Sequence, residues 1–275
     1  MSMRRLHNET RNKVDCNGFR WNFLNEDKKV SAANKQAIAS CRQKGMQFAI
    51  ASGRPLEPVL ELMKEWGIEE HCDYVLAMNG AEIFDCHTKD KESFYQLPAD
   101  VIKNIMKHYE NMNVRFYLFD KNIRYVNYSD DETKKAAEVF GEIEVQTDMF
   151  ALCSRPFTKL IVECDPEDMS IVEKHGQEYQ SDSCTCFKSA PNLFEFVDPR
   201  VNKSYGLKQL CERKGFSMKE VLAFGDTSND VEMLKDAGVG VWMSNGTQDA
   251  KEVANAYTLT NEEDGVAVYL NTHIL

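Results

Sequence analysis

Three short polar clusters interrupt apolar stretches of this 275-residue chain, and each carries side chains that can bind phosphate or a cation. The longest is F-G-D-T-S-N-D-V-E-M-L, in which Asp226 and Asp230 offer hard oxygen ligands suited to magnesium, and Asn229 can donate to a phosphate. The apolar run 221–224 before it is predicted to be a strand, and ligands of open α/β sheets bind at the carboxyl ends of strands. A plain turn followed by a capped helix is the alternative interpretation.

The other two clusters contain Ser52 and Lys203. In A-S-G-R-P, the hydroxyl of Ser52 and the backbone N–H groups of Gly53 and Arg54 precede a predicted helix, an arrangement that binds anions, although an ordinary Ser-Gly turn is the simpler interpretation. Lys203 opens a predicted helix, where its charge opposes the helix dipole. That placement is explained if the ammonium faces phosphate, and a solvated surface lysine is the alternative. Asn79, in M-N-G-A, is either a substrate contact or a turn residue.

Helical and strand patterns alternate on both sides of these clusters. Helices are predicted over 32–44, 57–66, 203–214, 229–237 and 247–254, and strands over 46–51, 73–78, 221–224, 239–243 and 257–258. This alternation is typical of a parallel α/β sheet. The middle of the chain mixes predicted strands at 94–96, 114–119, 123–127, 159–163 and 184–189 with helices at 99–111, 131–140 and 168–179. We therefore expect an α/β core formed by 1–84 and 191–275, with an inserted α+β domain over 85–190.

Composition narrows the classes of function. The chain has 33 Lys and Arg against 44 Asp and Glu, and the net charge of −11 argues against a surface that coats nucleic acid. No apolar run approaches the roughly 18 residues of a membrane span. The nine cysteines show no C-x-x-C pair and no zinc-type spacing, and Cys41 and Cys211 are predicted core residues. No apolar segment typical of a signal peptide follows the basic start, so we expect a cytoplasmic protein, monomeric or a small homo-oligomer.

Taken in order, the clusters resemble the haloacid dehalogenase (HAD) superfamily, and more narrowly its Cof-type, subfamily IIB phosphatases with a large α/β cap. The matching stretches are L-N-E-D-K-K-V-S, A-S-G-R-P, M-N-G-A, V-N-K-S-Y-G-L, F-G-D-T-S-N-D-V-E-M-L and N-E-E-D-G-V, from about residue 25 to the end. The resemblance implies a Rossmann-like parallel-sheet core with an inserted α+β cap that sets substrate specificity. The candidates to face substrate are Arg115 and Tyr117 in the inserted domain, and Asn192 and Glu195 just after it.

The resemblance also implies Mg2+-dependent hydrolysis of small phosphorylated metabolites, such as sugar phosphates, through an aspartyl-phosphate. One aspartate attacks phosphorus, and a second aspartate two residues later protonates the leaving oxygen. The implied catalytic residues are Ser52, Lys203 and Asp226, and the implied metal ligands are Asp226 and Asp230. The residues implied to bind phosphate are Ser52, Gly53, Arg54, Asn79 and Asn229.

The chain departs from the family at the motif D-x-D-G-T, which it lacks. Counting back from Asn25, the two aspartates would stand at Gly18 and Arg20, which can act neither as nucleophile nor as acid. The segment 9–16 is also too polar for a central buried strand. Asp15, in D-C-N-G, is a weaker substitute, because it needs three extra residues before Asn25 and leaves an amide in place of the acid.

The genetic code offers an explanation for the missing motif. Residues 12–23, N-K-V-D-C-N-G-F-R-W-N-F, can be encoded so that reading one nucleotide later gives I-K-L-I-A-M-D-L-D-G-T. That sequence is an apolar strand followed by the motif, with its aspartates in the codon slots of Gly18 and Arg20. Trp21 has a single codon, which limits the freedom of the match. We hypothesise that residues up to about 23 are frameshifted, and that a single-nucleotide indel near the Phe23 codon restores the frame.

Three functions remain open from the sequence. The first is a Mg2+-dependent phosphatase, of which the chain as written is an inactive or strongly impaired form. The second is a non-catalytic relative, in which Ser52, Lys203 and Asp226 bind a phosphorylated metabolite without turnover. The third is a mutase built on the same core, and no residue favours it.

Overall fold

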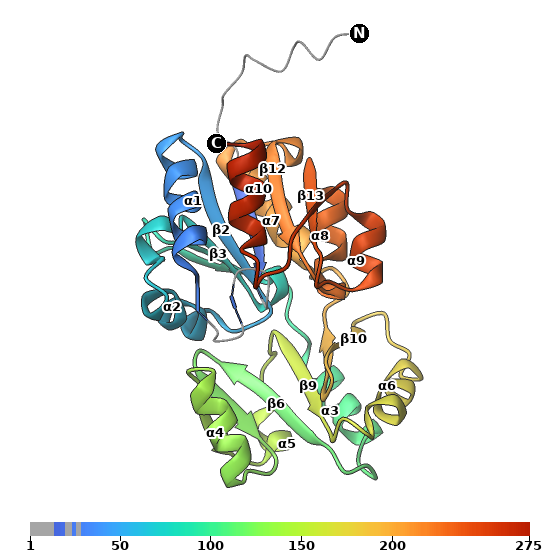
Figure 1. The fold of residues 1–275 in the computed structure, drawn as a ribbon. Coiled ribbons are helices and arrows are strands. Elements are labelled where there is room, and N and C mark those ends of the chain that lie inside the picture. Colours follow the sequence, from blue (N-terminus) through green and yellow to red (C-terminus); the bar gives the residue numbers. More distant parts are fainter. Residues whose placement is uncertain (1–13, 20–23, 26–28) are drawn as a thin grey trace. The chain divides into compact units, whose positions relative to one another are not determined.

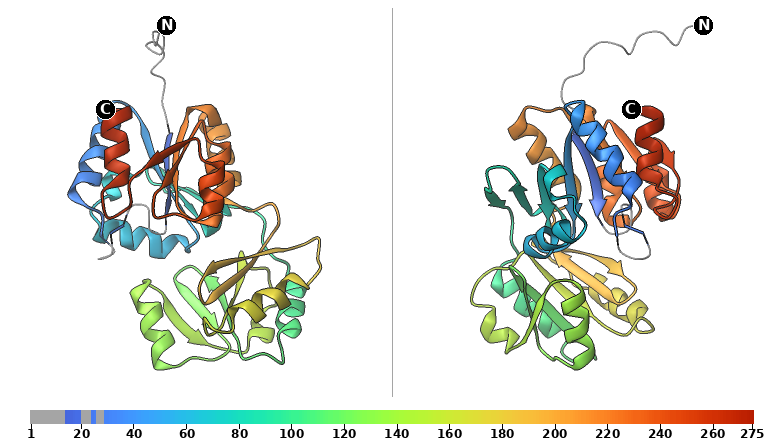
Figure 2. Two further views of the ribbon diagram at one scale, coloured as in Figure 1. Left: turned by 45° about the vertical axis from the view of Figure 1, so that its right-hand side comes forward. Right: turned by 60° about the vertical axis from the view of Figure 1, so that its left-hand side comes forward.

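A computed structural model describes residues 14–19, 24–25 and 29–275, the first of these segments by its backbone. The strands form two sheets (Figures 1 and 2). One sheet has eight strands in the order β14-β13-β12-β1-β2-β3-β4-β5, and the other has six in the order β10-β11-β9-β6-β7-β8. Helices and strands alternate around the larger sheet, which confirms the predicted α/β class. In the part of the chain described, no helix is both long and apolar enough to cross a membrane.

The eight-stranded sheet and its helices come from both ends of the chain. Its strands are β1 (Val14–Phe19), β2 (Gln47–Ser52), β3 (Tyr74–Ala77), β4 (Glu82–Asp85), β5 (Lys91–Ser93), β12 (Val221–Gly225), β13 (Val239–Met243) and β14 (Ala256–Thr258). The accompanying helices are α1 (Ala32–Gln43), α2 (Leu56–Glu65), α7 (Lys203–Lys214), α8 (Val231–Asp236), α9 (Gln248–Val253) and α10 (Gly265–His273). Short 3-10 turns are η1 (Glu69–His71), η2 (Met78–Gly80), η3 (Met218–Glu220) and η4 (Ser228–Asp230).

The six-stranded sheet is built from the middle of the chain. Its strands are β6 (Arg115–Asp120), β7 (Ile123–Val126), β8 (Ile143–Gln146), β9 (Lys159–Glu163), β10 (Thr185–Ala190) and β11 (Leu193–Val197). The helices are α3 (Ala99–His108), α4 (Asp131–Val139), α5 (Met149–Leu152) and α6 (Met169–Gln177). Apolar residues of α3 and α6 pack with alternate residues of β6, β9 and β11 into one core, which buries one face of this sheet.

The contacts divide the chain into two compact units. The first unit comprises 1–50, 70–73 and 207–275, and the second comprises 51–69 and 74–206. The strands β3 to β5 therefore group with the six-stranded sheet. We expected one domain formed by 1–84 with 191–275 and another formed by 85–190. The boundaries of these expected domains differ from those of the two compact units, and the expected division stays a prediction.

In the first unit, parallel strands form the centre. The strand β12 pairs in parallel with β1 and with β13, and all five of its residues are buried, as parallel strands covered on both faces require. The helix α1 begins after Ser31, whose side chain accepts a hydrogen bond from Asn34 N at 3.0 Å. α1 and α10 pack side by side (Figure 1). Cys41 and Cys211 are 3% and 2% exposed, which confirms them as core residues.

The strand β1 forms in spite of its polar sequence. Its backbone pairs in parallel with β12, and Asn17 lies opposite Phe224. The expectation that 9–16 is too polar for a central strand is therefore wrong from Val14 onward. A strand between β12 and β2 finds main-chain hydrogen-bond partners on both sides. Any non-proline sequence can use these partners, because the bonds involve only backbone N–H and C=O groups.

The strand expected at 94–96 is also wrong. The chain instead reverses after β3 and forms the antiparallel pairs β3 with β4 and β4 with β5. Met78 and Asn79 have left-handed φ angles of 52° and 56°, which make this reversal possible. The sequence pattern did not predict β4 (Glu82–Asp85), because this strand begins directly after the turn at 78–80.

Candidate active site

Asp226 lies at the carboxyl end of β12 and is 3% exposed. Its Oδ2 accepts a hydrogen bond from Asn245 Nδ2 at 3.4 Å, and its carbonyl oxygen accepts one from Thr247 N at 2.8 Å. Gly225 permits the close approach of the following loop, because a Cβ there would stand 2.7 Å from Asp230 Cβ. The strand end thus holds a carboxylate away from water, a setting in which a bound cation offsets the cost of desolvation.

Asp230 is engaged with its own loop. It is 1% exposed, and its Oδ2 accepts hydrogen bonds from the backbone N of Asp226 and of Thr227, each at 3.2 Å. Thr227 Oγ1 donates to Asn229 Oδ1 at 2.6 Å, so the NH2 end of Asn229 is the group that can donate to a phosphate oxygen. Asp230 therefore shapes the loop that carries Asp226, and its role as a metal ligand stays a prediction.

Asn245 is a residue of this loop cluster that the sequence patterns did not single out. It follows β13, the neighbour of β12, and its Oδ1 accepts a hydrogen bond from Asn261 N at 3.2 Å. Asn261 Nδ2 donates in turn to Leu24 O at 2.8 Å. Through Asn245 and Asn261, hydrogen bonds connect Asp226 to the loop after β14 and to the segment that follows β1. Its position just after a parallel strand was the signal available in the sequence.

The register of β1 identifies the residue that is level with the carboxyl end of β12. Asp15, Cys16 and Asn17 lie opposite Leu222, Ala223 and Phe224. One step further, Gly18 is level with Gly225, the residue before Asp226. Asp15 is three residues further back, or about 10 Å at the usual rise of a strand. The register therefore puts Gly18, and not Asp15, level with the residue that precedes Asp226.

The donor set for magnesium is incomplete. No group of three or more His, Cys, Asp or Glu side chains that could hold a metal occurs among residues 24–25 and 29–275. Gly18 has no side chain that could coordinate, and Arg20, which lies outside the described residues, is a cation by residue type. The residues present therefore do not fit the magnesium centre that the family resemblance implies.

The second unit holds the loop after β2. Ser52 is fully buried, and its Oγ accepts a hydrogen bond from Arg54 N at 3.1 Å. Arg54 O accepts one from Met78 N at 2.9 Å, which ties this loop to the end of β3. The Arg54 guanidinium lies 4.9 Å from the centre of the Phe140 ring. We call residues 52–54 the β2 loop.

The turn after β3 lies between the β2 loop and the start of α7. A Cβ on Gly53 would stand 2.9 Å from Asn79 Oδ1, and one on Gly80 would stand 2.5 Å from Asn202 O, so the backbones approach closely at both places. Lys203 is 1% exposed, which excludes the alternative of a solvated surface lysine. Left-handed non-glycine residues such as Asn79 cluster at functional sites.

The sequence-predicted residues thus form one cluster in each unit. The cluster of the first unit contains Asp226, Asn229 and Asp230, at the carboxyl end of β12. The cluster of the second unit contains Ser52, Gly53, Arg54, Asn79 and Lys203. Their roles stay predictions.

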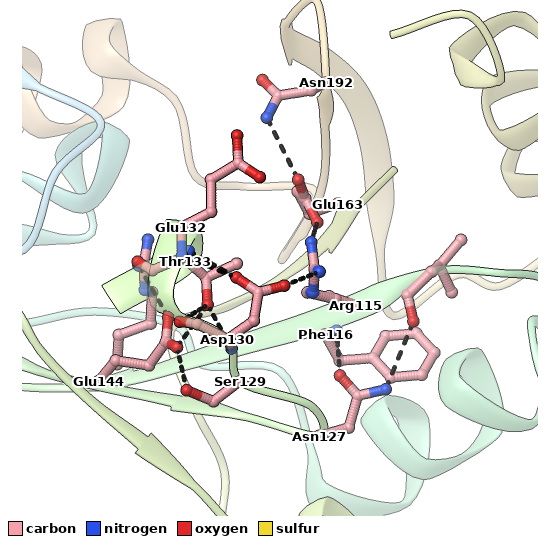
Figure 3. Close-up of polar contacts among 12 residues, drawn as sticks. Arg115, Phe116, Asn127, Ser129, Asp130, Glu132, Thr133, Glu144, Glu163 and Asn192 are labelled. Atoms are coloured by element: carbon pink, nitrogen blue, oxygen red, sulfur yellow. Dashed lines mark hydrogen bonds and ion pairs between the residues drawn. The ribbon is translucent and has the colours of Figure 1, made fainter. Parts of the chain in front are cut away.

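Two of the four substrate-facing candidates, Arg115 and Asn192, are held in polar contacts with neighbouring carboxylates (Figure 3). Arg115 lies between Asp130, at 2.5 Å, and Glu163, at 3.1 Å, and Asn192 Nδ2 donates to Glu163 Oε1 at 3.4 Å. Burial raises the pKa of the Tyr117 phenol, so this residue is a neutral donor at physiological pH. Two carboxylates pair with the guanidinium of Arg115, and its part in facing substrate stays a prediction.

Residues 22–270 match the family model of haloacid dehalogenase-like hydrolases. The chain belongs to this family. It is therefore, by family, a HAD-type phosphatase, as the Cof-type resemblance predicted. It is 28% identical over 257 residues to 5-amino-6-(5-phospho-D-ribitylamino)uracil phosphatase YitU of Bacillus subtilis, covering 91% of this chain and 93% of that protein.

Solved structures of the HAD family share the fold. A haloacid dehalogenase-like hydrolase from Bacteroides thetaiotaomicron has a TM-score of 0.84 and 27% identity, and the match covers 95% of this chain and 99% of that one. The HAD subclass IIB sugar phosphatase BT4131 has a TM-score of 0.82 at 19% identity, covering 94% of this chain and 98% of that one. The second likeness concerns the fold alone.

Proposed function

We propose that the gene of this chain encodes a Mg2+-dependent phosphatase of small phosphorylated metabolites, sugar phosphates among them, and that the chain as written lacks its nucleophile through a frameshifted N-terminus. The observation that carries the proposal is the register of β1, in which Gly18 reaches the level of Gly225. A family aspartate is missing from the strand end where the loop of Asp226 begins. The family match from residue 22 onward agrees with a frame restored near Phe23.

The chemistry follows from an aspartate restored at position 18. Its carboxylate attacks phosphorus, the phosphorus–oxygen bond to the leaving group breaks, and an acid restored at position 20 donates a proton to the leaving oxygen. Water then hydrolyses the aspartyl-phosphate and releases inorganic phosphate. Ser52 and Lys203 bind phosphoryl oxygens by hydrogen bond and by charge. The restored aspartates also complete the acidic donor set beside Asp226. We place the enzyme in the cytoplasm, as a monomer or a small homo-oligomer.

Relatives support the class of substrate. YitU is named for a phosphorylated ribitylaminouracil, and BT4131 is called a sugar phosphatase. Both substrates are small organic phosphates. The same class fits Ser52, Arg54 and Lys203, which provide a hydroxyl and two cations from one unit of the chain.

The second candidate function is a non-catalytic protein that binds a phosphorylated metabolite. The residue types at Gly18 and Arg20 favour it, because neither provides a carboxylate. The two functions separate in one experiment. Phosphate release is measured for the chain as written and for Gly18→Asp/Arg20→Asp, across a panel of sugar phosphates with Mg2+. Turnover by the double variant alone supports the phosphatase, and binding without turnover by either protein supports the second function.

A further inference from the structure

Two oppositely charged residues are buried on one face of the six-stranded sheet. Lys159 of β9 and Glu195 of β11 are each 4% exposed, and Lys159 Nζ lies 3.0 Å from Glu195 Oε2. Their neighbours Leu160 and Phe194 belong to the apolar core under α3 and α6, so strand alternation puts the charged pair on the opposite face. Glu195 lies opposite Ile161 in the ladder, which makes it a diagonal neighbour of Lys159, within reach of long side chains.

The same two side chains contact the turn after β3 and the β2 loop. Lys159 Nζ donates to Gly53 O at 2.9 Å, and Asn79 Nδ2 donates to Glu195 Oε2 at 3.4 Å. The position of a Cβ on Gly53 is 2.9 Å from Asn79 Oδ1. The four residues therefore form a closed ring: Gly53 to Lys159, Lys159 to Glu195, Glu195 to Asn79, and Asn79 against Gly53. All four belong to the second unit.

A buried ion pair is a costly way to fill space. Removing two charges from water costs several kcal/mol, and well-packed apolar side chains of similar size often give equal or greater stability. The presence of these two charges is explained if the hydrogen bonds of Lys159 and Glu195 serve to hold the β2 loop and the turn after β3. Lys159 holds a carbonyl beside Ser52, and Glu195 holds the amide of a residue in a left-handed conformation.

We propose that Lys159 and Glu195 are positioning residues, which hold Gly53 and Asn79 and thereby orient the β2 loop for binding a phosphoryl group. The contact of Arg54 with Phe140 is a second attachment of the same loop to the segment after α4. The orientation of Ser52 for phosphate rests on the proposed function. The holding of the loops does not, so the two can fail separately.

Hydrogen exchange tests the holding directly in the chain as written. Backbone exchange is followed in peptides that cover 47–56 and 74–84, for the unmodified chain, Lys159→Met and the double variant Lys159→Met/Glu195→Met. The double variant removes both charges, so it leaves no unpaired ion inside the protein. The matched control is Arg124→Met, which removes an equally buried cation of the same sheet that pairs with Glu144 at 2.9 Å and has no hydrogen bond to either loop.

Both Lys159 variants should raise exchange at 52–54 and 78–80 by about tenfold or more, with smaller changes in α3 and α6. Arg124→Met should raise exchange in α4, β7 and β8 and leave the two loops near their original rates. The proposal is overturned if both loops of the double variant exchange at the rates of the unmodified chain. In that case each charge of the pair would only compensate the other, and neither would hold a loop. It is equally overturned if exchange rises by the same factor throughout the second unit.

An activity readout links the loops to phosphate. In a chain with the aspartates restored at positions 18 and 20, the Lys159→Met/Glu195→Met change should lower kcat/KM by at least about tenfold at temperatures well below the Tm. If the pair only stabilised the fold, the double change would alter kcat/KM of the folded enzyme by no more than about twofold. If the restored chain shows no turnover at all, the proposed function fails, whereas the exchange experiment still decides whether the pair holds the loops.

Discussion

Asn17 of β1 pairs with Phe224 of β12 in parallel register, so the next residue along each strand, Gly18 and Gly225, reaches the same edge of the sheet. Asp226 follows at once and is buried there. A family nucleophile would stand at the place that glycine occupies. The backbone follows the fold of the HAD hydrolases, and the sequence has glycine at the position where the proposed function requires a carboxylate.

The coding DNA across codons 7 to 24 should contain the missing motif in the frame shifted by one nucleotide. The expected shifted reading is an apolar strand followed by D-L-D-G-T, with the aspartates in the slots of Gly18 and Arg20. Sequencing the genomic locus checks this. A shifted frame without D-L-D-G-T would mean that the loss of the nucleophile is genuine, and binding without catalysis would then be the leading account.

Asp226 and Asp230 should respond differently to substitution, although they share a loop. Asp230→Ala removes the acceptor of two backbone N–H groups and should lower the free energy of unfolding by about 1–3 kcal/mol. Asp226→Asn keeps the shape of the side chain and an oxygen that can accept from Asn245, so it should lower the free energy of unfolding by less than Asp230→Ala does. Urea unfolding at pH 7 measures both. A larger loss for Asp226→Asn than for Asp230→Ala would contradict the assignment of Asp230 to the loop.

Glu142 should make stability depend on pH. Burial raises the pKa of its carboxyl group above the ordinary value, in spite of Arg124 at 3.5 Å. Because the pKa is higher in the folded than in the unfolded chain, the stabilisation is complete below about pH 4.3 and is lost as the pH rises through the folded pKa. Glu142→Gln should therefore gain stability relative to the unmodified chain between pH 4 and pH 7.

The matched control for this pH dependence is Glu144→Gln. Glu144 accepts hydrogen bonds from Arg124 at 2.9 Å, Ser129 at 2.6 Å and Thr133 at 2.7 Å, so losing its charge should destabilise the protein at neutral pH. Urea unfolding at several pH values compares the two variants. A Glu142→Gln variant whose stability runs parallel to that of the unmodified chain at every pH would show that this carboxyl does not carry the dependence.

Local signals in the sequence were enough to predict many elements. Short runs with an apolar centre predicted the strands 159–163 and 239–243 with the bounds that the structure has, and Ser31 predicted the start of α1. The order of polar clusters at strand ends was enough for the family. Such strands, helix starts and family motifs are each set by residues that are close together in the sequence, so a single sequence can indicate them.

Features that depend on distant contacts were not predicted. β1 is polar by composition, and its formation depends on the backbone partners supplied by its neighbours in the sheet. Asn245 and Lys159 are ordinary polar residues in the sequence. Their importance lies in contacts with Asp226 and Gly53, which are 19 and 106 positions away along the chain. A single sequence holds no periodic signal for such contacts.

Phosphate release with and without the restored motif tests the central claim most directly. The chain as written is compared with a chain in which residues 12–23 are replaced by I-K-L-I-A-M-D-L-D-G-T-F, both of verified mass, on sugar phosphates with Mg2+. We expect background release from the chain as written and turnover several orders of magnitude higher from the restored chain. Robust turnover by the chain as written, abolished by Asp15→Asn, or a folded restored chain that stays at background, would contradict the account.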